Sequence, residues 1–460
     1  MGALVEAGID GARINCSHGT PREWKLWVEH LRAAAAEAGR PVAIVFDLQG
    51  PKIRLAEATQ EREVRRGERL TLTEGEVASP DGLAVPHARI LASMVPGRSE
   101  VVIGDGLPRF AVERVAGRGS ARHAVLRCVR PGAVTSRKGA LVTRGRPKSQ
   151  PSLTDKDLAD LKVARSCQAD FVALSYVRSA RDIAALRRHL AAARFPARVI
   201  AKIETIAAME ALAAITAASD AVMVARGDLG VEAGVAAVPM MQRAIVHESA
   251  RQGRLSIMAT QMIESMVASS QPTRAEATDI ATAVIQGTSA MMLSAETAVG
   301  RFPIEAVRAM AEIAYAAEGQ GTTAPRPRAP SSDQESVMHA AAALGESVGA
   351  AAYVVPTASG GAARALAMYR PAAPIVALAH AEPAARQLAL EWGVVPTLLP
   401  ATTSLESMIE AAVTRTLELV PIPAGAPVVV TSGRSVDAPA STSLIALRRV
   451  VRRARKPGPA

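Results

Sequence analysis

A lysine and two carboxylates follow two successive apolar runs near the middle of the chain. In IAKIET, Lys202 and Glu204 are two residues apart, which places their side chains on one face of an extended strand. The next run leads into VARGDLG, where glycines on both sides of Asp228 permit a tight turn into a helix. Two carboxylates with few other protein ligands suit Mg²⁺, and a lysine beside that ion suits phosphoryl transfer. The alternatives are a structural ion pair between Lys202 and Glu204 and an ordinary Gly-Asp turn.

Three further apolar runs carry polar residues that could join this site. In ARINCSH, Arg13, Asn15 and Ser17 alternate along one side of an extended chain. Thr260 and Ser294 each end a later run and could offer a hydroxyl group. One phosphate, one carboxylate and one metal ion could use all of these groups together, and this combination favours a functional site over isolated structural residues.

The elements that must position these residues alternate between strand and helix. Short β-rich runs, each followed by a helical stretch, occur seven times, at residues 11–15, 42–48, 171–177, 198–204, 221–227, 256–261 and 290–296. Such alternation predicts a parallel sheet with helices as crossovers. In a β/α barrel the carboxyl ends of all strands open on one face, which would bring the polar strand ends together. The pattern from Thr273 to Glu276 is a capping box and predicts the start of a helix.

Other segments interrupt and follow the barrel. Residues 56–151 alternate apolar and polar residues between Gly and Pro turns, which predicts an inserted antiparallel β domain that forms a lid. The barrel then comprises residues 1–55 and 152–318. Residues 319–332 are rich in Pro, Ser, Thr and Gly, as expected for a linker. Residues 333–460 have the pattern of a further α/β domain.

The composition excludes several classes of protein. With 460 residues, of which 49% are hydrophobic and 21% charged, the chain can bury large cores in two or three domains. No apolar run approaches the roughly 20 residues that span a bilayer, so we expect no membrane partner. Cys16, Cys128 and Cys167 have neither paired nor metal-type spacing, which indicates a reducing, cytoplasmic location.

The net charge of +11 raises nucleic acid as a partner, because nucleic-acid-binding surfaces are basic. An aromatic content of 3% argues against it, since few rings are available to stack on bases. We interpret the basic stretch LRRVVRRARKPGPA as a last strand followed by a solvated end. The positive charge suits small phosphorylated anions instead.

Motifs along nearly the whole chain resemble those of pyruvate kinases, in the same order. They are RINCSHG, DLQGPKIR, LTDKDLADL, IAKIET, MVARGDLGVE, MATQMIESM, PTRAEATDIATAV, MLSAETAVGRFP, YRPAAPIVAL and RQLALEWGVVP. The resemblance implies an α/β fold with a TIM (β/α)8-type barrel, an inserted small β-barrel lid domain and a C-terminal α/β regulatory domain, commonly as a homotetramer. It implies transfer of the phosphoryl group of phosphoenolpyruvate to ADP, giving pyruvate and ATP.

On matching positions the resemblance implies how substrate and metal are bound. Glu204 and Asp228 would bind a divalent metal, Mg²⁺ or Mn²⁺. Lys202 would contact the transferring phosphoryl group, and Arg13 would face the substrate phosphate. The backbone N–H groups of Gly227 and Asp228 would bind the substrate carboxylate.

The resemblance also implies roles for a second set of residues. The Thr260 hydroxyl would contact the substrate carboxylate, and Thr260 and Ser294 would help to relay the proton that quenches the enolate. Asn15, Arg54 and Lys156 fall where the family contacts the nucleotide phosphates. The lid sequence SRKGALVTRGRPKSQ departs from the usual pattern of the family, which makes contacts from the lid less predictable than those from the barrel.

Many pyruvate kinases require potassium, which lies among oxygens at positions matching Asn15, Ser17, Asp47 and Leu48. Those enzymes typically carry Thr at the position of Leu48 and Glu at the position of Lys52. The chain resembles the potassium-independent branch at these places, and we expect the Lys52 ammonium to fill the cation pocket, attracted by Asp47. The alternative is that Lys52 is a solvated surface lysine.

Two expectations concern the ends of the chain. The family has a strand ending in Gly-Pro before the opening helix ALVEAG, so with seven units counted we expect an upstream start or a truncated sequence. In the last domain, we expect a cradle for a phosphorylated effector, formed by Thr357, Ser359, Gly360, Gly361, Ser432 and Arg434. An ordinary Gly-rich turn is the alternative.

Two other functions stay open from the sequence. Barrel lyases and aldolases that act on pyruvate or phosphoenolpyruvate also use magnesium bound by Glu and Asp, but they need neither DLQGPKIR, nor the lid, nor the third domain. A catalytically silent paralogue that only binds metabolites is the other alternative.

Overall fold

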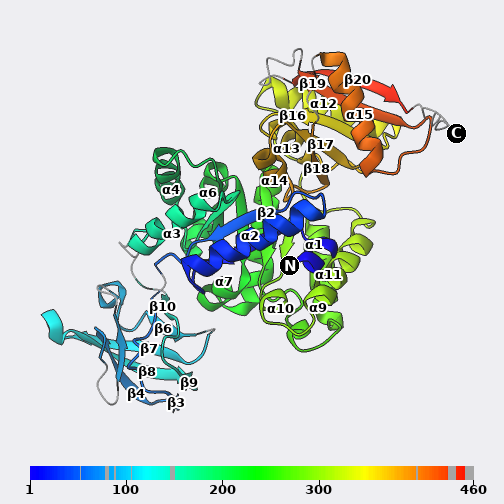
Figure 1. Ribbon diagram of the computed structural model, residues 1–460. Helices are drawn as coiled ribbons and strands as arrows, with labels where there is room; N and C mark the ends of the chain where they lie inside the picture. Colours follow the sequence, from blue (N-terminus) through cyan, green and yellow to red (C-terminus); the bar gives the residue numbers. More distant parts are fainter. Residues whose placement is uncertain are drawn as a thin grey trace.

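The computed structural model describes residues 1–51, 53–77, 82–86, 90–104, 106–143, 145, 151–399, 402, 404–433 and 442–450. A curled parallel sheet forms the centre of the molecule, and its strands follow one another in the order β1-β2-β11-β12-β13-β14-β15 (Figure 1). Their bounds are β1 Gly11–Asn15, β2 Ala43–Asp47, β11 Phe171–Leu174, β12 Arg198–Ile203, β13 Ala221–Ala225, β14 Leu255–Ala259 and β15 Ala290–Met292. The seven predicted strands and the TIM-type α/β fold class are confirmed.

Helices cover the outer face of this sheet. The longer ones are α2 Pro21–Glu37, α3 Asp155–Ser166, α4 Ala180–Ala192, α8 Val238–Arg251, α9 Arg274–Gln286 and α11 Pro303–Glu318. The shorter ones are α1 Gly2–Glu6, α5 Ile206–Glu210, α6 Leu212–Ala218, α7 Arg226–Ala233 and α10 Ala295–Ala298, with 3₁₀ turns η3 Val235–Ala237 and η4 Glu264–Val267. The predicted capping box begins α9, since Thr273 Oγ1 accepts from Glu276 N and the Glu276 carboxylate accepts from Thr273 N.

Strands end earlier than the sequence predicts, and left-handed residues explain two of the cases. β11 stops at Leu174 because Tyr176 has a φ of 54°. β14 stops at Ala259 because Thr260 and Gln261 have φ values of 69° and 54°. β13 ends at Ala225, where the chain passes directly into α7, so the glycine-flanked Asp228 lies in the first turn of that helix.

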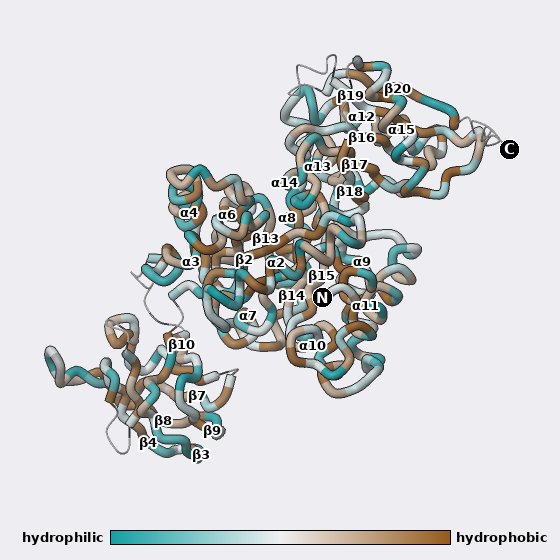
Figure 2. The backbone as a smooth tube through the Cα atoms, in the orientation of Figure 1, coloured by the Kyte–Doolittle hydropathy of each residue, from teal (hydrophilic) through white to brown (hydrophobic). Residues whose placement is uncertain are grey.

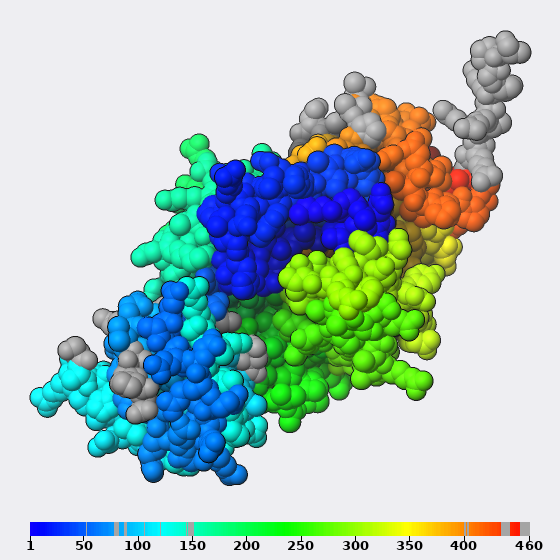
Figure 3. Space-filling model, turned by 60° about the horizontal axis from the view of Figure 1, so that its bottom comes forward, coloured from blue at the N-terminus to red at the C-terminus, as the bar shows by residue number. Residues whose placement is uncertain are grey.

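The two faces of the parallel sheet are apolar. One packs against the helices through a core that includes Phe46, Val172 and Ile203, while the other buries Phe171 and Ile200 inside the curl. Figure 2 shows this hydrophobic character along the strands. Helix α1 packs against α2 and α11, which brings the first and last parts of the barrel segment side by side (Figure 3).

A separate β unit is inserted between β2 and α3 and stands beside the barrel (Figure 1). A sheet with the strand order β10-β6-β7-β8-β4-β5 contains β4 Arg69–Glu74, β5 Gly82–Val85, β6 Glu100–Ile103, β7 Arg109–Ala116, β8 His123–Arg130 and β10 Ala140–Thr143. A second sheet pairs β3 Arg62–Val64 with β9 Gly132–Val134, and η1 Leu91–Ser93 and η2 Gly119–Ala121 are 3₁₀ turns. The described pairs are antiparallel, except that β4 and β5 are parallel, which differs from the predicted all-antiparallel pattern. The unit has its own core, with Phe110 and Leu126 at its centre.

The C-terminal α/β unit contains a sheet with the strand order β18-β17-β16-β19-β20. Its strands are β16 Ala352–Thr357, β17 Ile375–Ala379, β18 Val394–Leu398, β19 Pro427–Gly433 and β20 Thr442–Arg449, and β20 runs antiparallel to β19. Its helices are α12 Asp333–Val348, α13 Gly361–Ala367, α14 Glu382–Leu388 and α15 Leu405–Leu419. Arg386 of α14 donates to Asp170 of the barrel at 2.9 Å, so a buried ion pair joins the two units.

No single helix among the described residues is long and apolar enough to cross a bilayer. The pair formed by α7 and Val235–Arg251, bent by 118°, passes the same test together, by length and composition alone.

Candidate active site

Lys202 and Glu204 face one another at the end of β12, in a cluster supplied by three neighbouring strands. Lys202 Nζ lies 2.8 Å from Glu204 Oε1 and 3.2 Å from Asp47 Oδ1, and it donates to Ser175 Oγ at 2.8 Å. Asp47 ends β2 and Ser175 follows β11, which lies between β2 and β12. All four residues are buried. Ser175 was not predicted as a site residue, although it also directly follows a strand.

The charges in this cluster stabilise one another. Burial alone would lower the pKa of Lys202, but the carboxylates of Asp47 and Glu204 outweigh burial and raise it. Burial alone would raise the pKa of Asp47, but Lys202 and Arg13 outweigh it and lower the pKa. Lys202 is therefore a fixed ammonium at neutral pH, and an anion that enters the site meets a positive charge that needs no reorganisation.

Asp47 also holds Arg13, which belongs to β1 on the other side of β2. Arg13 Nε donates to Asp47 Oδ2 at 2.6 Å. The side chain of Arg13 is 24% exposed, whereas that of Asp47 is 1% exposed. The guanidinium group of Arg13 is therefore accessible, while the carboxylate of Asp47 that holds it is buried. One carboxylate thus orients both cations that were predicted to face the phosphoryl group.

The predicted metal ligands come from adjacent strand-helix units: Glu204 directly follows β12, and Asp228 lies in the first turn of α7, which follows β13. Burial raises the pKa of Glu204; Lys202 opposes this shift, and the nearby charge of Asp228 adds to it. Glu204 Oε2 accepts a hydrogen bond from the backbone N–H of Tyr176 at 2.7 Å, which fixes the carboxylate. Two close carboxylates, one of them buried, favour a bound cation. Among the described residues, no group of three or more His, Cys, Asp or Glu could hold a metal ion. Mg²⁺ is usually bound by one or two carboxylates together with substrate and water oxygens, so Glu204 and Asp228 are ligands of a suitable type.

Gly227 and Thr260 contact each other across the gap between β13 and β14. The Gly227 N–H, predicted to bind a substrate carboxylate, donates here to Thr260 Oγ1 at 3.0 Å. Because that oxygen is the acceptor, the hydroxyl hydrogen of Thr260 is directed elsewhere and can be donated to a substrate. A Cβ atom at Gly227 would lie 3.7 Å from Thr260 Oγ1 and would narrow this gap.

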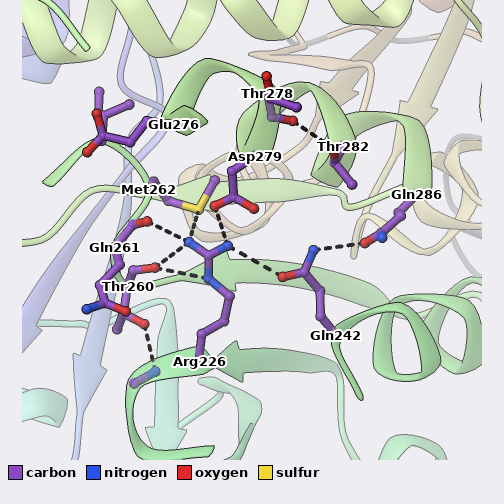
Figure 4. A network of polar contacts seen from close by, with 12 residues as sticks. Arg226, Gln242, Thr260, Gln261, Met262, Glu276, Thr278, Asp279, Thr282 and Gln286 are labelled. Carbon is purple, nitrogen blue, oxygen red and sulfur yellow. Dashed lines mark hydrogen bonds and ion pairs between the residues drawn. The ribbon is translucent and has the colours of Figure 1, made fainter. Parts of the chain in front are cut away.

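The loop that carries Thr260 is held by Arg226, a buried residue that sequence reasoning missed (Figure 4). Its guanidinium donates to Thr260 O at 2.6 and 3.1 Å and to Gln261 O at 2.8 Å, and Nη1 lies 2.5 Å from Asp279 Oδ2. Gln242, itself bonded to Gln286, and Met262 complete the network. Two successive residues with positive φ are costly for side chains other than glycine, and these bonds offset that cost. The position of Arg226 beside Asp228, directly after a buried strand, is the feature that could have revealed it.

Ser294 lies just beyond β15. Its backbone N–H donates to Glu296 Oε2 at 2.7 Å, while its hydroxyl is buried and has no hydrogen-bond partner within the described part of the chain. A buried hydroxyl without a partner is costly, and a bound substrate or water could supply one. The part of Ser294 in the proton relay stays a prediction.

The predicted monovalent-cation pocket is already partly engaged by the protein. Asn15 Oδ1 accepts from the backbone N–H of Ser17 at 3.1 Å, and Leu48 O accepts from Ser175 Oγ at 2.7 Å. Asp47 binds Arg13 and Lys202, as described above. Lys52 lies outside the described residues.

The predicted nucleotide contacts lie at the rim of the barrel. Lys156 Nζ donates to Cys16 O at 2.7 Å and to Asp160 Oδ2 at 2.6 Å, and it lies 5.4 Å from the centre of the Trp24 ring. Arg54 donates to Arg137 O at 3.2 Å, which ties the start of the inserted β unit to its end. The structure does not bring Lys156 or Arg54 into direct contact with Lys202.

In the C-terminal unit, the hydrogen bonds around the predicted effector cradle are those of a Gly-rich turn. Thr357 Oγ1 accepts from Gly360 N at 3.0 Å, and Ser432 Oγ donates to Gly433 O at 2.8 Å. Gly360 has a φ of 82°, and Gly361 begins helix α13. The carbonyl of Ser359 accepts from an arginine of α13, Arg364, at 2.6 Å. Arg434 lies outside the described residues, and effector binding by this loop stays a prediction.

Comparisons with known proteins agree with this arrangement. A family model of the pyruvate kinase barrel domain matches residues 1–307, and one of the pyruvate kinase alpha/beta domain matches residues 335–447. A pyruvate kinase of Mycobacterium tuberculosis is 38% identical over 451 residues, which cover 97% of this chain and 94% of that protein. A pyruvate kinase of Geobacillus stearothermophilus is 35% identical over 457 residues, which cover 96% of this chain and 76% of that protein. With both domain types matched in order and relatives aligned over nearly its full length, the chain belongs to the pyruvate kinase family.

Proposed function

We propose that the protein transfers the phosphoryl group of phosphoenolpyruvate to ADP and yields pyruvate and ATP. The observation that carries this proposal is the buried Lys202 ammonium, held between Asp47 and Glu204 at the carboxyl face of the barrel. Membership of the pyruvate kinase family makes the protein a phosphotransferase.

Lys202 and Arg13 supply the positive charge for the reaction. As the bond between phosphorus and the enolate oxygen breaks, negative charge builds on the bridging and equatorial oxygens, and the Lys202 ammonium neutralises it. Arg13 binds and orients the phosphate from the opposite side of Asp47. Because Asp47 anchors both cations, we assign it a positioning role.

Glu204 and Asp228 would hold Mg²⁺ or Mn²⁺. The ion would neutralise charge on the oxygens of the substrate, in the way that divalent metals assist phosphoryl transfer. The raised pKa of Glu204 shows that its carboxylate is destabilised by burial and by Asp228, and a cation at that place would relieve both effects.

Thr260 and Ser294 are proposed to bring a proton to the enolate after phosphoryl transfer. Thr260 accepts a hydrogen bond from Gly227, so its own hydrogen can point into the site. Ser294 has a buried hydroxyl that lacks a hydrogen-bond partner among the described residues.

We propose that Asn15, Arg54 and Lys156 contact the nucleotide phosphates. Lys156 would then exchange its bonds to Cys16 O and Asp160 for the nucleotide.

We further propose that the reaction needs no potassium, because the chain has Lys52 at the position where potassium-dependent relatives carry glutamate.

We also propose that the protein is a homotetramer. Light scattering of the purified chain tests this oligomeric state.

A coupled pyruvate-formation assay with phosphoenolpyruvate, ADP and Mg²⁺ tests the main proposal. Phosphoryl transfer requires ADP and forms ATP and pyruvate in equal amounts. Turnover of substrate without nucleotide would indicate a lyase. A folded protein that binds phosphoenolpyruvate without turnover would be a silent member of the family.

A further inference from the structure

Ser175 is an uncharged residue among the charged groups that surround Lys202. It directly follows β11 and is 2% exposed. Its hydroxyl oxygen lies 2.8 Å from Lys202 Nζ and 2.7 Å from the carbonyl oxygen of Leu48, which follows β2. Because β11 runs between β2 and β12, this hydroxyl group connects the ends of the two outer strands.

The single hydrogen of the Ser175 hydroxyl group is directed to Leu48. Two acceptors lie near Ser175 Oγ, namely Leu48 O at 2.7 Å and Asp47 Oδ1 at 3.4 Å. The first distance is typical of an O–H···O hydrogen bond, whereas the second is long. With its hydrogen donated to Leu48 O, the hydroxyl oxygen presents its lone pairs to the ammonium group of Lys202, which can only donate. Ser175 is thus a fixed acceptor for Lys202.

The ammonium group of Lys202 has three hydrogens and three oxygen neighbours. Glu204 Oε1 and Ser175 Oγ each lie at 2.8 Å, while Asp47 Oδ1 lies at 3.2 Å. The last distance is long for a hydrogen bond between two charged groups. A phosphoryl oxygen can therefore replace the contact to Asp47 most easily, while the two shorter bonds keep the ammonium group in place.

The backbone around Ser175 is closely held. The next residue, Tyr176, has a φ of 54°, and its N–H donates to Glu204 Oε2 at 2.7 Å. Two consecutive residues thus hold the Lys202–Glu204 pair, since Ser175 binds the lysine and Tyr176 binds the glutamate. A Cβ atom at Gly50 would lie 3.0 Å from Ser175 Cβ and 3.3 Å from Ser175 O, so the turn at Gly50 packs tightly against the serine. These contacts fix the direction of the hydroxyl group.

We propose that Ser175 is a positioning residue for phosphoryl transfer. Together with Glu204, it holds the Lys202 ammonium group so that the third hydrogen, which is directed to Asp47, can be presented to the phosphoryl group. Without the serine hydroxyl, the ammonium group keeps only carboxylate partners and turns toward them. Stabilisation of the transition state depends on donors that are in place before the reaction begins. The inference rests on the proposed function, because it assigns Ser175 a part in that reaction.

Steady-state kinetics and thermal unfolding of Ser175→Ala test this role. We expect kcat to fall by roughly tenfold, as for the loss of one hydrogen bond to a charged group. The KM for phosphoenolpyruvate should change by less than about twofold, because the lost interaction acts in the transition state. A merely structural role would instead raise KM and lower the melting temperature.

Two further variants separate the hydroxyl group from the packing of the side chain. Ser175→Thr keeps the hydroxyl group and should restore most of kcat. Ser249→Ala is the matched control, because Ser249 is a buried serine of α8 whose hydroxyl also donates to a backbone carbonyl, Ile245 O, at 2.7 Å. It should leave kcat unchanged. Equal losses of kcat in Ser175→Ala and Ser175→Thr would contradict a role of the hydroxyl group.

A double-mutant cycle shows whether Ser175 acts through Lys202. In a protein that already carries Lys202→Met, Ser175→Ala should lower kcat little further, because the group that Ser175 positions is gone. Additive losses, or an unchanged kcat in Ser175→Ala alone, would overturn the inference. The unmodified protein separates this inference from the proposed function. If it forms no pyruvate from phosphoenolpyruvate and ADP, the proposed function fails, whereas additive losses in an active protein contradict only the role of Ser175.

Discussion

Lys202 Nζ and Asp47 Oδ1 lie 3.2 Å apart, although β11 separates the strands that carry them. The other oxygen of Asp47 binds Arg13. A single buried carboxylate therefore fixes the spacing of the two cations that we assign to the phosphoryl group, and it keeps the pKa of Lys202 high enough for the ammonium form to persist.

Lys202→Met should lower kcat by about 100-fold or more, because the lost interaction stabilises charge that exists only in the transition state. Metal-dependent binding of phosphoenolpyruvate should be largely intact. The coupled assay measures the first effect and calorimetry the second. Lys162→Met, an exposed lysine of α3, is the matched control. Near-normal turnover of a folded Lys202→Met protein would remove Lys202 from the mechanism.

Arg226→Lys should reduce kcat by about tenfold or more, since lysine cannot bind Thr260 O, Gln261 O and Asp279 together in a planar fork. Asp279→Asn serves as the comparison, because it leaves the bonds of Arg226 to the loop intact and should change kcat much less. If both variants lost activity equally, the charge of Asp279 rather than the position of the Thr260 loop would be the important factor.

Glu335 should contribute to stability in a pH-dependent way. Hydrogen bonds from Arg328 lower the pKa of Glu335 to about 2, against 4.5 for an ordinary glutamate. Because the folded-state pKa is the lower one, the stabilisation is present above pH 4.5 and is lost as the pH falls toward 2.

Glu335→Gln should therefore lower the free energy of unfolding by about 1–2 kcal/mol at pH 7, and the difference should shrink below pH 4.5. Urea unfolding at pH 7, 5, 4 and 3 measures it. Glu346→Gln, at an exposed position of the same helix, should show no such trend. A difference that stays constant with pH would contradict an ionic role.

The reaction should proceed at near-full rate with Mg²⁺ in a tetramethylammonium buffer that lacks sodium and potassium. The physical reason is that Lys52 carries the same single positive charge as potassium. Lys52→Glu should create a potassium requirement, which initial rates at increasing potassium concentration would reveal. Strong activation of the unmodified protein by potassium would show that Lys52 does not replace the ion.

The sequence alone determined the order of strands and helices and the residues that end the strands. Hydrophobic periodicity and capping residues act over a few positions, so the seven parallel strands and the start of α9 at Thr273 could be predicted from local patterns. The spacing of Lys202 and Glu204 likewise placed both side chains on one face, where the structure has them 2.8 Å apart.

Only the tertiary structure decided which distant residues meet. Asp47 and Lys202 are far apart in sequence. No local pattern predicts that β11 lies between β2 and β12, or that the side chains of Asp47 and Lys202 meet across it. The packing of separate elements also decides that Arg226 donates hydrogen bonds to Thr260 and Gln261. It likewise decides that Arg254 of the barrel and Arg364 of the C-terminal unit line the same cavity. Hydrogen bonds and ion pairs act over about 3 Å, so contacts across strands and between units are fixed by the folded arrangement rather than by spacing along the chain.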